Sequence, residues 1–325
     1  ENFNIGIKEL EILVKDFFDD NGFPLSRNPN DLVFFLKYLL FCKEVIKDSQ
    51  RYMPEFLEDI IEKNLNCIHY IKTPSNQLPL FNGATPLNLD QIDKYLENFK
   101  SDNKNNNLGG LFRIKHKKNF LLIDIDKPPE KKFSKSYQSG PLSFEFFLDG
   151  VKIITNCGFG KHVSKKAELL SRLTACQSTL TINDTSITNF EKNEMINKVF
   201  GNSIQNSFKS FDFSSTNENN LIGCSVSSNG YEKSFGCTHK REIYFDKENN
   251  CLKGIDHVFK TKDGYPIRYA FRFHINPELS VVKTMSGNSA LIQISKNKSL
   301  IFSVANENLE VEKSIFFGEK KIIDS

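Results

Sequence analysis

The first hundred residues have apolar side chains at the spacing of α-helices. Between Leu10 and Phe18 they recur at intervals of three and four, and Asp20-Asn21-Gly22 ends that segment. Asn28 is a suitable N-cap because its side-chain oxygen can accept from a free backbone N–H, and Pro29 suits the first helical turn. The pattern predicts about four helices, which lie around Leu10 to Phe18, after Asn28-Pro29, over Pro54 to Ile71 and over Leu89 to Phe99.

The rest of the chain alternates apolar and polar side chains, as strands do. In Leu142 to Leu148 the period is two, and Asp149-Gly150 then gives a two-residue hairpin turn. The polar run 101–107 separates the two patterns. We therefore predict an α+β multidomain fold, with helices in residues 1–105 and a large antiparallel β-sandwich in residues 106–325. Further hairpins are predicted at 241–256 and 290–306, and one alternating strand at 269–275.

Composition argues against several classes of function. The 325 residues include 43 basic and 40 acidic side chains, for a net charge of +3, and this balance argues against nucleic-acid binding. The seven cysteines are irregularly spaced and form no CxxC pair, so neither a disulfide framework nor a thiolate zinc site is expected. The sequence has no apolar run of about 18 residues, so no membrane insertion is expected.

A set of short stretches, in a fixed order, resembles the heparinase II/III family of polysaccharide lyases. Members of that family have an α/α toroid followed by a C-terminal β-sandwich. The resemblance implies that residues 1–105 are the last helices of an incomplete toroid in a longer protein. The first two helices should then expose an apolar rim. The stretches are DNGFPLSRNP (20–29), LPLFNGATP (78–86), LSFEFFLDGVKIITNCGFG (142–160), LTACQSTLTINDTS (173–186), THKREI (238–243), GIDHVF (254–259) and RFHINP (272–277).

The resemblance also implies β-elimination on an acidic, uronic acid-containing polysaccharide. Such an enzyme neutralises the carboxylate, removes the neighbouring proton and protonates the leaving oxygen. Where family members carry histidines and an aspartate, this chain has Gln138, Asn156 and Gln177, which we call the amide cluster. Amides are poor zinc ligands, so we expect hydrogen bonds among them, with no metal and no cofactor. Together with Tyr137 they are expected to line a sugar-sized groove between helices and sheets.

Five further side chains are candidates for the site. Tyr137 and His239 are the candidate acid–base residues; the alternatives are a tyrosine packed at the domain junction and a histidine bonded to a loop. Arg27 can hold a sugar carboxylate with its guanidinium fork, or bridge the helical and strand-rich parts. Arg272 and His274 share one face of the strand predicted at 269–275, as an anion-binding pair or as a solvated sheet face. With the amide cluster, these last three are the candidate substrate-binding residues.

Two functions remain open at this point. One is a polysaccharide lyase-like protein with a diverged, metal-free site. The other is a non-catalytic carbohydrate-binding or scaffold protein that kept the fold and lost the catalytic His and Tyr. In either case we expect this chain alone to be inactive. The resemblance implies periplasmic export, whereas unpaired cysteines favour the cytoplasm, so the compartment stays open.

Overall fold

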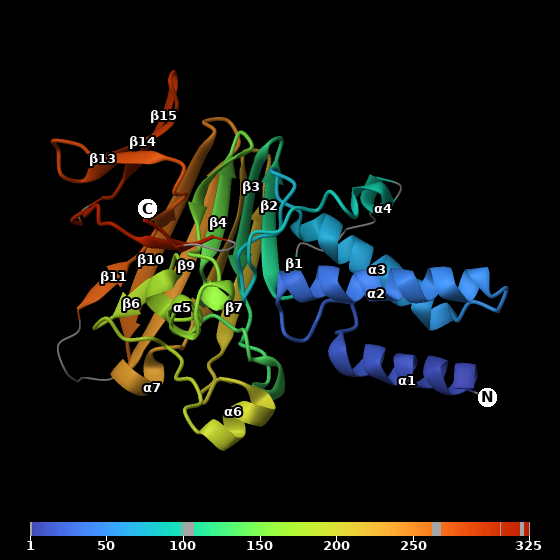
Figure 1. Ribbon diagram of the computed structural model, residues 1–325. Helices are drawn as coiled ribbons and strands as arrows, with labels where there is room; N and C mark the ends of the chain where they lie inside the picture. Colours follow the sequence, from blue (N-terminus) through green and yellow to red (C-terminus); the bar gives the residue numbers. More distant parts are fainter. Residues whose placement is uncertain are drawn as a thin grey trace.

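Helices come first and antiparallel sheets follow, which makes the fold α+β as predicted (Figure 1). The computed structural model describes residues 2–97, 99, 107–261, 268–305, 307–318 and 322–324. The boundary predicted at 101–107 lies, apart from Asn107, outside the described residues. The helices are α1 (Asn2–Phe17), α2 (Pro29–Asp48), α3 (Glu55–Ile71), α4 (Asp93–Glu97), α5 (Lys165–Ser171), α6 (Glu194–Phe200) and α7 (Glu232–Phe235), with 3₁₀ turns η1 (Lys131–Phe133), η2 (Gly160–His162) and η3 (Thr174–Cys176).

The first three helices form where the sequence pattern predicts them. At the start of α2 the Asn28 side chain accepts from the backbone N–H of Asn30 at 2.9 Å, and Pro29 is the first helical residue. The fourth predicted helix is wrong in extent. Its first residues are used in turns, where the Leu89 N–H donates to the Asn76 carbonyl at 3.1 Å, so only α4 remains helical.

Two large antiparallel sheets follow, one of six strands in the order β1-β2-β3-β4-β5-β12 and one of four in the order β10-β9-β8-β7. Smaller sheets are β11-β6, β13-β14-β15 and β16-β17. The strands are β1 (Asn107–Leu108), β2 (Leu111–His116), β3 (Asn119–Asp124), β4 (Phe144–Leu148), β5 (Val151–Thr155), β6 (Leu180–Ile182), β7 (Ser210–Asn217), β8 (Leu221–Ser228), β9 (Cys237–Asp246), β10 (Cys251–Lys260), β11 (Tyr269–Phe271), β12 (His274–Ile275), β13 (Ser280–Lys283), β14 (Ser289–Ser295), β15 (Lys298–Ser303), β16 (Ile315–Phe317) and β17 (Ile322–Asp324).

The predicted hairpins are present. Strands β4 and β5 turn at Asp149-Gly150, β9 pairs with β10, and β14 pairs with β15. The single strand predicted at 269–275 is wrong. Its first part, β11, pairs with β6, whereas its second part, β12, joins β5 in the larger sheet. The break falls at Arg272, where the backbone N–H donates to the Thr179 carbonyl at 3.0 Å.

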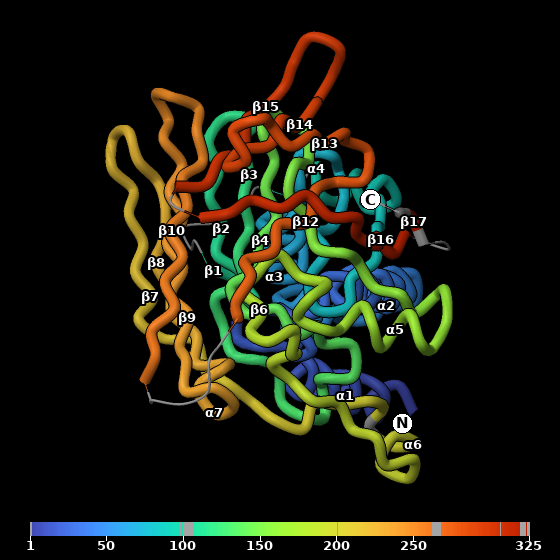
Figure 2. The backbone as a smooth tube through the Cα atoms, turned by 90° about the vertical axis from the view of Figure 1, so that its left-hand side faces the viewer, coloured from blue at the N-terminus to red at the C-terminus, as the bar shows by residue number. Residues whose placement is uncertain are grey.

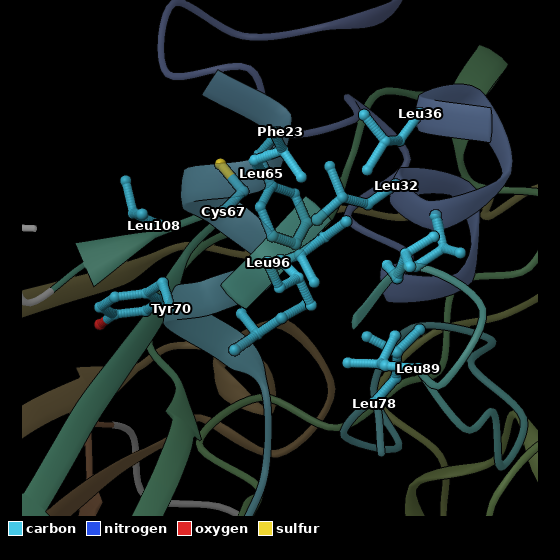
Figure 3. Packing of buried hydrophobic residues seen from close by; sticks show 14 of the residues in the cluster. Phe23, Leu32, Leu36, Leu65, Cys67, Tyr70, Leu78, Leu89, Leu96 and Leu108 are labelled. Atoms are coloured by element: carbon cyan, nitrogen blue, oxygen red, sulfur yellow. The ribbon is translucent and has the colours of Figure 1, made fainter. Parts of the chain in front are cut away.

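Two cores hold this arrangement together. One lies between the two large sheets, where Ile114 and Phe146 pack in the same cluster as Ile243 and Phe245. The other joins the helices to the outer face of the six-stranded sheet, and part of it is shown in Figure 3. Tyr70 of α3 lies at its edge, and its hydroxyl donates to the Leu111 carbonyl at 3.1 Å. The helices and the sheet are therefore packed as one unit.

The expected apolar rim is present on the first two helices. These helices extend to one side of the sheets, with α1 farthest from β2 to β4 (Figure 1). Exposure of 67% for Phe41 and 59% for Tyr38 is far above that of core side chains. The exposed apolar residues are Ile5, Ile12, Leu13 and Phe17 on α1, and Phe34, Tyr38, Phe41 and Val45 on α2.

Two substitutions on α2 test this division between core and rim. Leu36 is fully buried and Phe41 is 67% exposed, so Leu36→Ala should lower the free energy of unfolding by about 2–5 kcal/mol. Phe41→Ala should change it by less than about 0.5 kcal/mol. Urea unfolding followed by circular dichroism measures both. Equal losses would show that the Phe41 face is covered in solution.

Candidate functional site

The Gln138 side chain connects three separate segments at the junction of helices and sheets. Its Oε1 accepts from the Gly83 backbone N–H at 2.9 Å. Its Nε2 donates to the carbonyls of Gly158 and Ser171, both at 2.8 Å. Both hydrogens and the oxygen of the amide therefore have protein partners, as buried polar groups require.

The other two amides extend the same network. Asn156 Nδ2 donates to the Leu80 carbonyl at 3.1 Å, and its Oδ1 accepts from the Ser178 backbone N–H at 3.0 Å. Gln177 Nε2 donates to the Ser171 carbonyl at 3.0 Å, the same oxygen that Gln138 uses. The bonds expected among the three amides are thus replaced by bonds to the backbone, and two of the amides meet at the Ser171 carbonyl. Through these backbone partners the amide cluster ties the loop after α3 to the segments that follow the strands.

The groove expected along this cluster is not present in the part of the chain that the structure describes. Gln138 is 2% exposed, Asn156 0%, Gln177 1% and Tyr137 0%. Their hydrogen bonds and packing close the space where a sugar would have to lie. A binding role for these four side chains would need the junction to open.

Tyr137 has the surroundings of a packed tyrosine. It lies in a hydrophobic cluster with Leu180 and Ile182, and its buried hydroxyl has no hydrogen-bond partner among the described residues. Burial raises the pKa of Tyr137 well above its ordinary value. A proton donor to a sugar must be reachable from the surface, and Tyr137 is fully buried.

Arg27 bridges the helical and strand-rich parts of the chain, which was one of the two alternatives for it. Its Nη2 lies 2.6 Å from Asp124 Oδ1, and the pair is almost completely buried. The remaining bonds of the guanidinium go to the carbonyls of Gly109, Lys127 and Gly110. All three nitrogens are engaged, so the fork is not free for a carboxylate ligand.

His239 lies in a buried ion-pair network on β9. Its Nε2 is 2.8 Å from Asp256 Oδ1, and Arg241 Nε approaches the same oxygen at 2.7 Å. Burial lowers the pKa of His239, although Asp256 acts in the opposite direction. His239 is 5% exposed and is fixed by its neighbours, which is a structural role. Its partner is Asp256 of the adjacent strand β10, whereas the alternative from the sequence expected a loop.

Arg272 and His274 do not form a single strand face. The Arg272 side chain is 29% exposed and makes long contacts with Asp184 at 3.4 Å and Glu312 at 3.6 Å. His274 turns inward, with Nε2 2.9 Å from the Ala175 carbonyl and Nδ1 3.3 Å from Cys157 Sγ. Burial lowers the pKa of His274 to about 4, so the ring is neutral at pH 7.

Sequence reasoning missed Arg172, a fully buried arginine of the junction. It donates to the carbonyls of Tyr137, Ser134 and Asn202 at 2.6–2.9 Å. Its guanidinium also lies 4.0 Å from the ring centroid of Phe190. Arg172 lies outside the stretches that carry the resemblance, so only its burial in the structure shows that it holds the junction.

Neither a metal site nor a membrane span is found in the described residues. No three His, Cys, Asp or Glu side chains in these segments are close enough together to hold a metal ion. None of the described helices is both long and apolar enough to cross a bilayer.

Comparison with known proteins identifies the family. The family model described as "Heparinase II/III-like, C-terminal" matches residues 100–323. This chain belongs to the heparinase II/III-like family. No curated protein matches the sequence.

Solved structures extend the likeness to the helices. Heparan sulfate lyase HepC from Pedobacter heparinus is 16% identical, with a TM-score of 0.74 over 98% of this chain. A heparinase III is 13% identical, with a TM-score of 0.71 over 99%. At such identities the likeness concerns the fold. This heparinase II/III-like chain covers 51% and 54% of those two chains, about half of each.

The buried His274 gives this heparinase II/III-like chain a specific dependence on pH. The pKa of His274 is about 4 in the folded chain, whereas an ordinary histidine has a pKa of 6.5. Between pH 4 and pH 6.5 the unfolded chain therefore binds more protons than the folded chain. Its contribution to stability is present above pH 6.5 and is lost as the pH falls towards 4. Between pH 7 and 5 the wild type should lose about 2 kcal/mol more unfolding free energy than His274→Gln. Urea titrations at both values measure this, and parallel losses in the two proteins would contradict it.

Proposed function

We propose that the protein binds acidic, uronic acid-containing polysaccharide, and that this chain supplies a scaffold and part of the binding surface. In this proposal the chain holds no complete acid–base set for β-elimination. The observation that carries it is the closure of the amide cluster. By the sequence resemblance, Gln138, Asn156 and Gln177 stand where the family builds its site. Each is at most 2% exposed and hydrogen-bonded.

The domain arrangement belongs to the same proposal. Residues 1–105 are the end of an α/α toroid, and residues 106–325 form a β-sandwich. Shared packing of the two large sheets supports the sandwich. The exposed apolar rim of α1 and α2 supports further helices packed against it, because this chain spans about half of the similar solved chains.

A basic surface beside the junction supports an acidic ligand. Lys135 follows η1 and Lys161 lies in η2, and both side chains are exposed. They come close to Asp31 in the first turn of α2, where both lower its pKa against the larger, raising effect of burial. Neither lysine has an ion-pair partner among the described residues. Sulfate or carboxylate groups of a polysaccharide are suitable partners for them.

Lyase activity of a longer protein is the second candidate. It is favoured by the fold shared with a heparan sulfate lyase whose chain is about twice as long. In this version the acid–base groups come from helices outside the present chain, and Arg272, 29% exposed, is the remaining candidate in this chain that can reach an anion.

A binding and turnover assay on this chain tests the scaffold proposal. The same turnover assay on a longer protein that includes the further helices tests the second candidate, which an absorbance rise there would support. The purified chain is mixed with heparan sulfate, chondroitin sulfate and alginate; binding is measured by calorimetry and turnover by the absorbance of unsaturated uronate. We expect binding to at least one polysaccharide without an absorbance rise. A rise with this chain alone would overturn the scaffold proposal, and absence of binding to all three would overturn the choice of ligand.

A charge-removing double variant tests the binding surface. Lys135→Ala with Lys161→Ala should weaken binding to the acidic polysaccharide about five- to ten-fold, because each lysine contributes up to about 1 kcal/mol. The loss should shrink as salt rises, since screening weakens exposed charge pairs. The control is Lys283→Ala in β13 with Lys296→Ala in the turn between β14 and β15, which removes the same charge elsewhere. If both double variants weakened binding equally, the effect would depend on net charge alone and not on this surface.

A further inference from the structure

Two cysteines meet beside the amide cluster. Cys157 follows β5 and Cys176 ends η3, and the Cys157 backbone N–H donates to the Cys176 carbonyl at 3.0 Å. Residues joined in this way have Cα atoms roughly 5–6 Å apart, within the range that disulfides span. Both side chains pack in one small cluster with Ala167 and Phe317. Figure 2 shows the segments that carry these two neighbours, α5 and β16, on the same side of the molecule.

His274 and Ser314 complete the surroundings of Cys157. His274 Nδ1 lies 3.3 Å from Cys157 Sγ and 3.0 Å from Ser314 Oγ. His274 Nε2 faces the Ala175 carbonyl at 2.9 Å, and since a carbonyl only accepts, Nε2 carries the ring proton. Nδ1 then carries the lone pair of the ring, which is directed at the Cys157 thiol and the Ser314 hydroxyl. His274 Nδ1 therefore offers the Cys157 thiol a hydrogen-bond acceptor.

The two thiols are not equivalent. Cys157 is 2% exposed, whereas Cys176 is partly exposed. The neighbouring Cys157 thiol lowers the pKa of Cys176, and Arg272 lowers it further, against the effect of burial. Cys176 and burial together raise the pKa of Cys157. Because Cys176 is partly exposed and Cys157 is buried, Cys176 is the thiol that an oxidant reaches first, and Cys157 lies beside it as its partner.

We propose that Cys157 and Cys176 form a reversible redox pair that closes to a disulfide when hydrogen peroxide oxidises Cys176. The Cys176 sulfur attacks one peroxide oxygen, the O–O bond breaks, and a sulfenic acid and one water result. The Cys157 sulfur then attacks the sulfenic sulfur, forms the S–S bond and releases hydroxide. The proton from Cys157 joins that hydroxide as a second water. Thus two thiols and one peroxide give one disulfide and two waters. Two molecules of a small thiol then reduce the disulfide back to two cysteine thiols and leave as their own disulfide.

The position of the pair links it to the junction. Asn156 precedes Cys157 and Gln177 follows Cys176, so the disulfide would cross-link the two segments that carry these amides. Oxidation would make the amide cluster more rigid, while the reduced pair leaves it held by hydrogen bonds alone. This inference goes beyond the proposed function and does not depend on it.

Peroxide titration of the wild-type chain tests the pair directly. The reduced protein is treated with hydrogen peroxide near one equivalent, and free thiols are then counted and disulfide-linked peptides mapped by mass spectrometry. The expected result is a loss of two thiols, a single linkage between Cys157 and Cys176, and a melting temperature raised by about 2–4 °C. A different linkage, or oxidation that begins at the exposed Cys251, would overturn the proposal.

Serine variants assign the roles of the two thiols. In Cys157→Ser the sulfenic acid on Cys176 has no partner, so trapping with dimedone should rise several-fold over wild type. In Cys176→Ser the fast reaction with peroxide should disappear. Cys251→Ser is the control, because it removes an exposed thiol outside the cluster and should leave the disulfide yield unchanged. Dimedone labelling that is the same in Cys157→Ser and wild type would contradict the pairing.

Discussion

The hydrogen bonds of the Gln138 amide are the constraint on which the rest of this structure depends. A single side chain joins Gly83, in the loop after α3, to Gly158 at the end of β5 and to Ser171 at the end of α5. Unpaired amide groups inside a protein cost more than any one of these bonds returns, so the three partners hold each other in place. The junction between helices and sheets is closed because this amide is satisfied there.

Two buried arginines also hold the junction together. The buried Arg27–Asp124 pair links the start of α2 to the end of β3. Arg172 holds the loop of Tyr137 through two carbonyls and the segment after α6 through the carbonyl of Asn202. Arg27 does so with a φ of 57°, a conformation that is costly for a residue with a side chain. A rigid junction suits a scaffold that presents surface charges such as Lys135 and Lys161. It does not suit residues that must exchange protons with a substrate.

Much of the fold follows from the sequence, and the exceptions have physical causes. Periodicity located α2 and α3, and Asp149-Gly150 located a hairpin, because local backbone preferences decide these elements. The strand at 269–275 was predicted as one and is two. Its alternation is satisfied by either sheet, and only tertiary pairing shows that the chain changes sheet at Arg272.

The site was less predictable than the fold. The ordered motifs led to the correct family and to the three amides, but not to their burial, which depends on where Gly83 and Ser171 arrive in space. Nor does spacing along the chain reveal that Cys157 and Cys176 meet, or that Lys135 and Lys161 both lie near Asp31.

The substitution Gln138→Met tests the central claim most directly, since it keeps the size of the side chain and removes its three hydrogen bonds. If the amide cluster is structural, urea unfolding should show a loss of about 2–4 kcal/mol, while affinity for the acidic polysaccharide stays within two-fold of wild type. Unchanged stability together with lost affinity would mean that Gln138 contacts the sugar, and would contradict a structural role for the amide cluster.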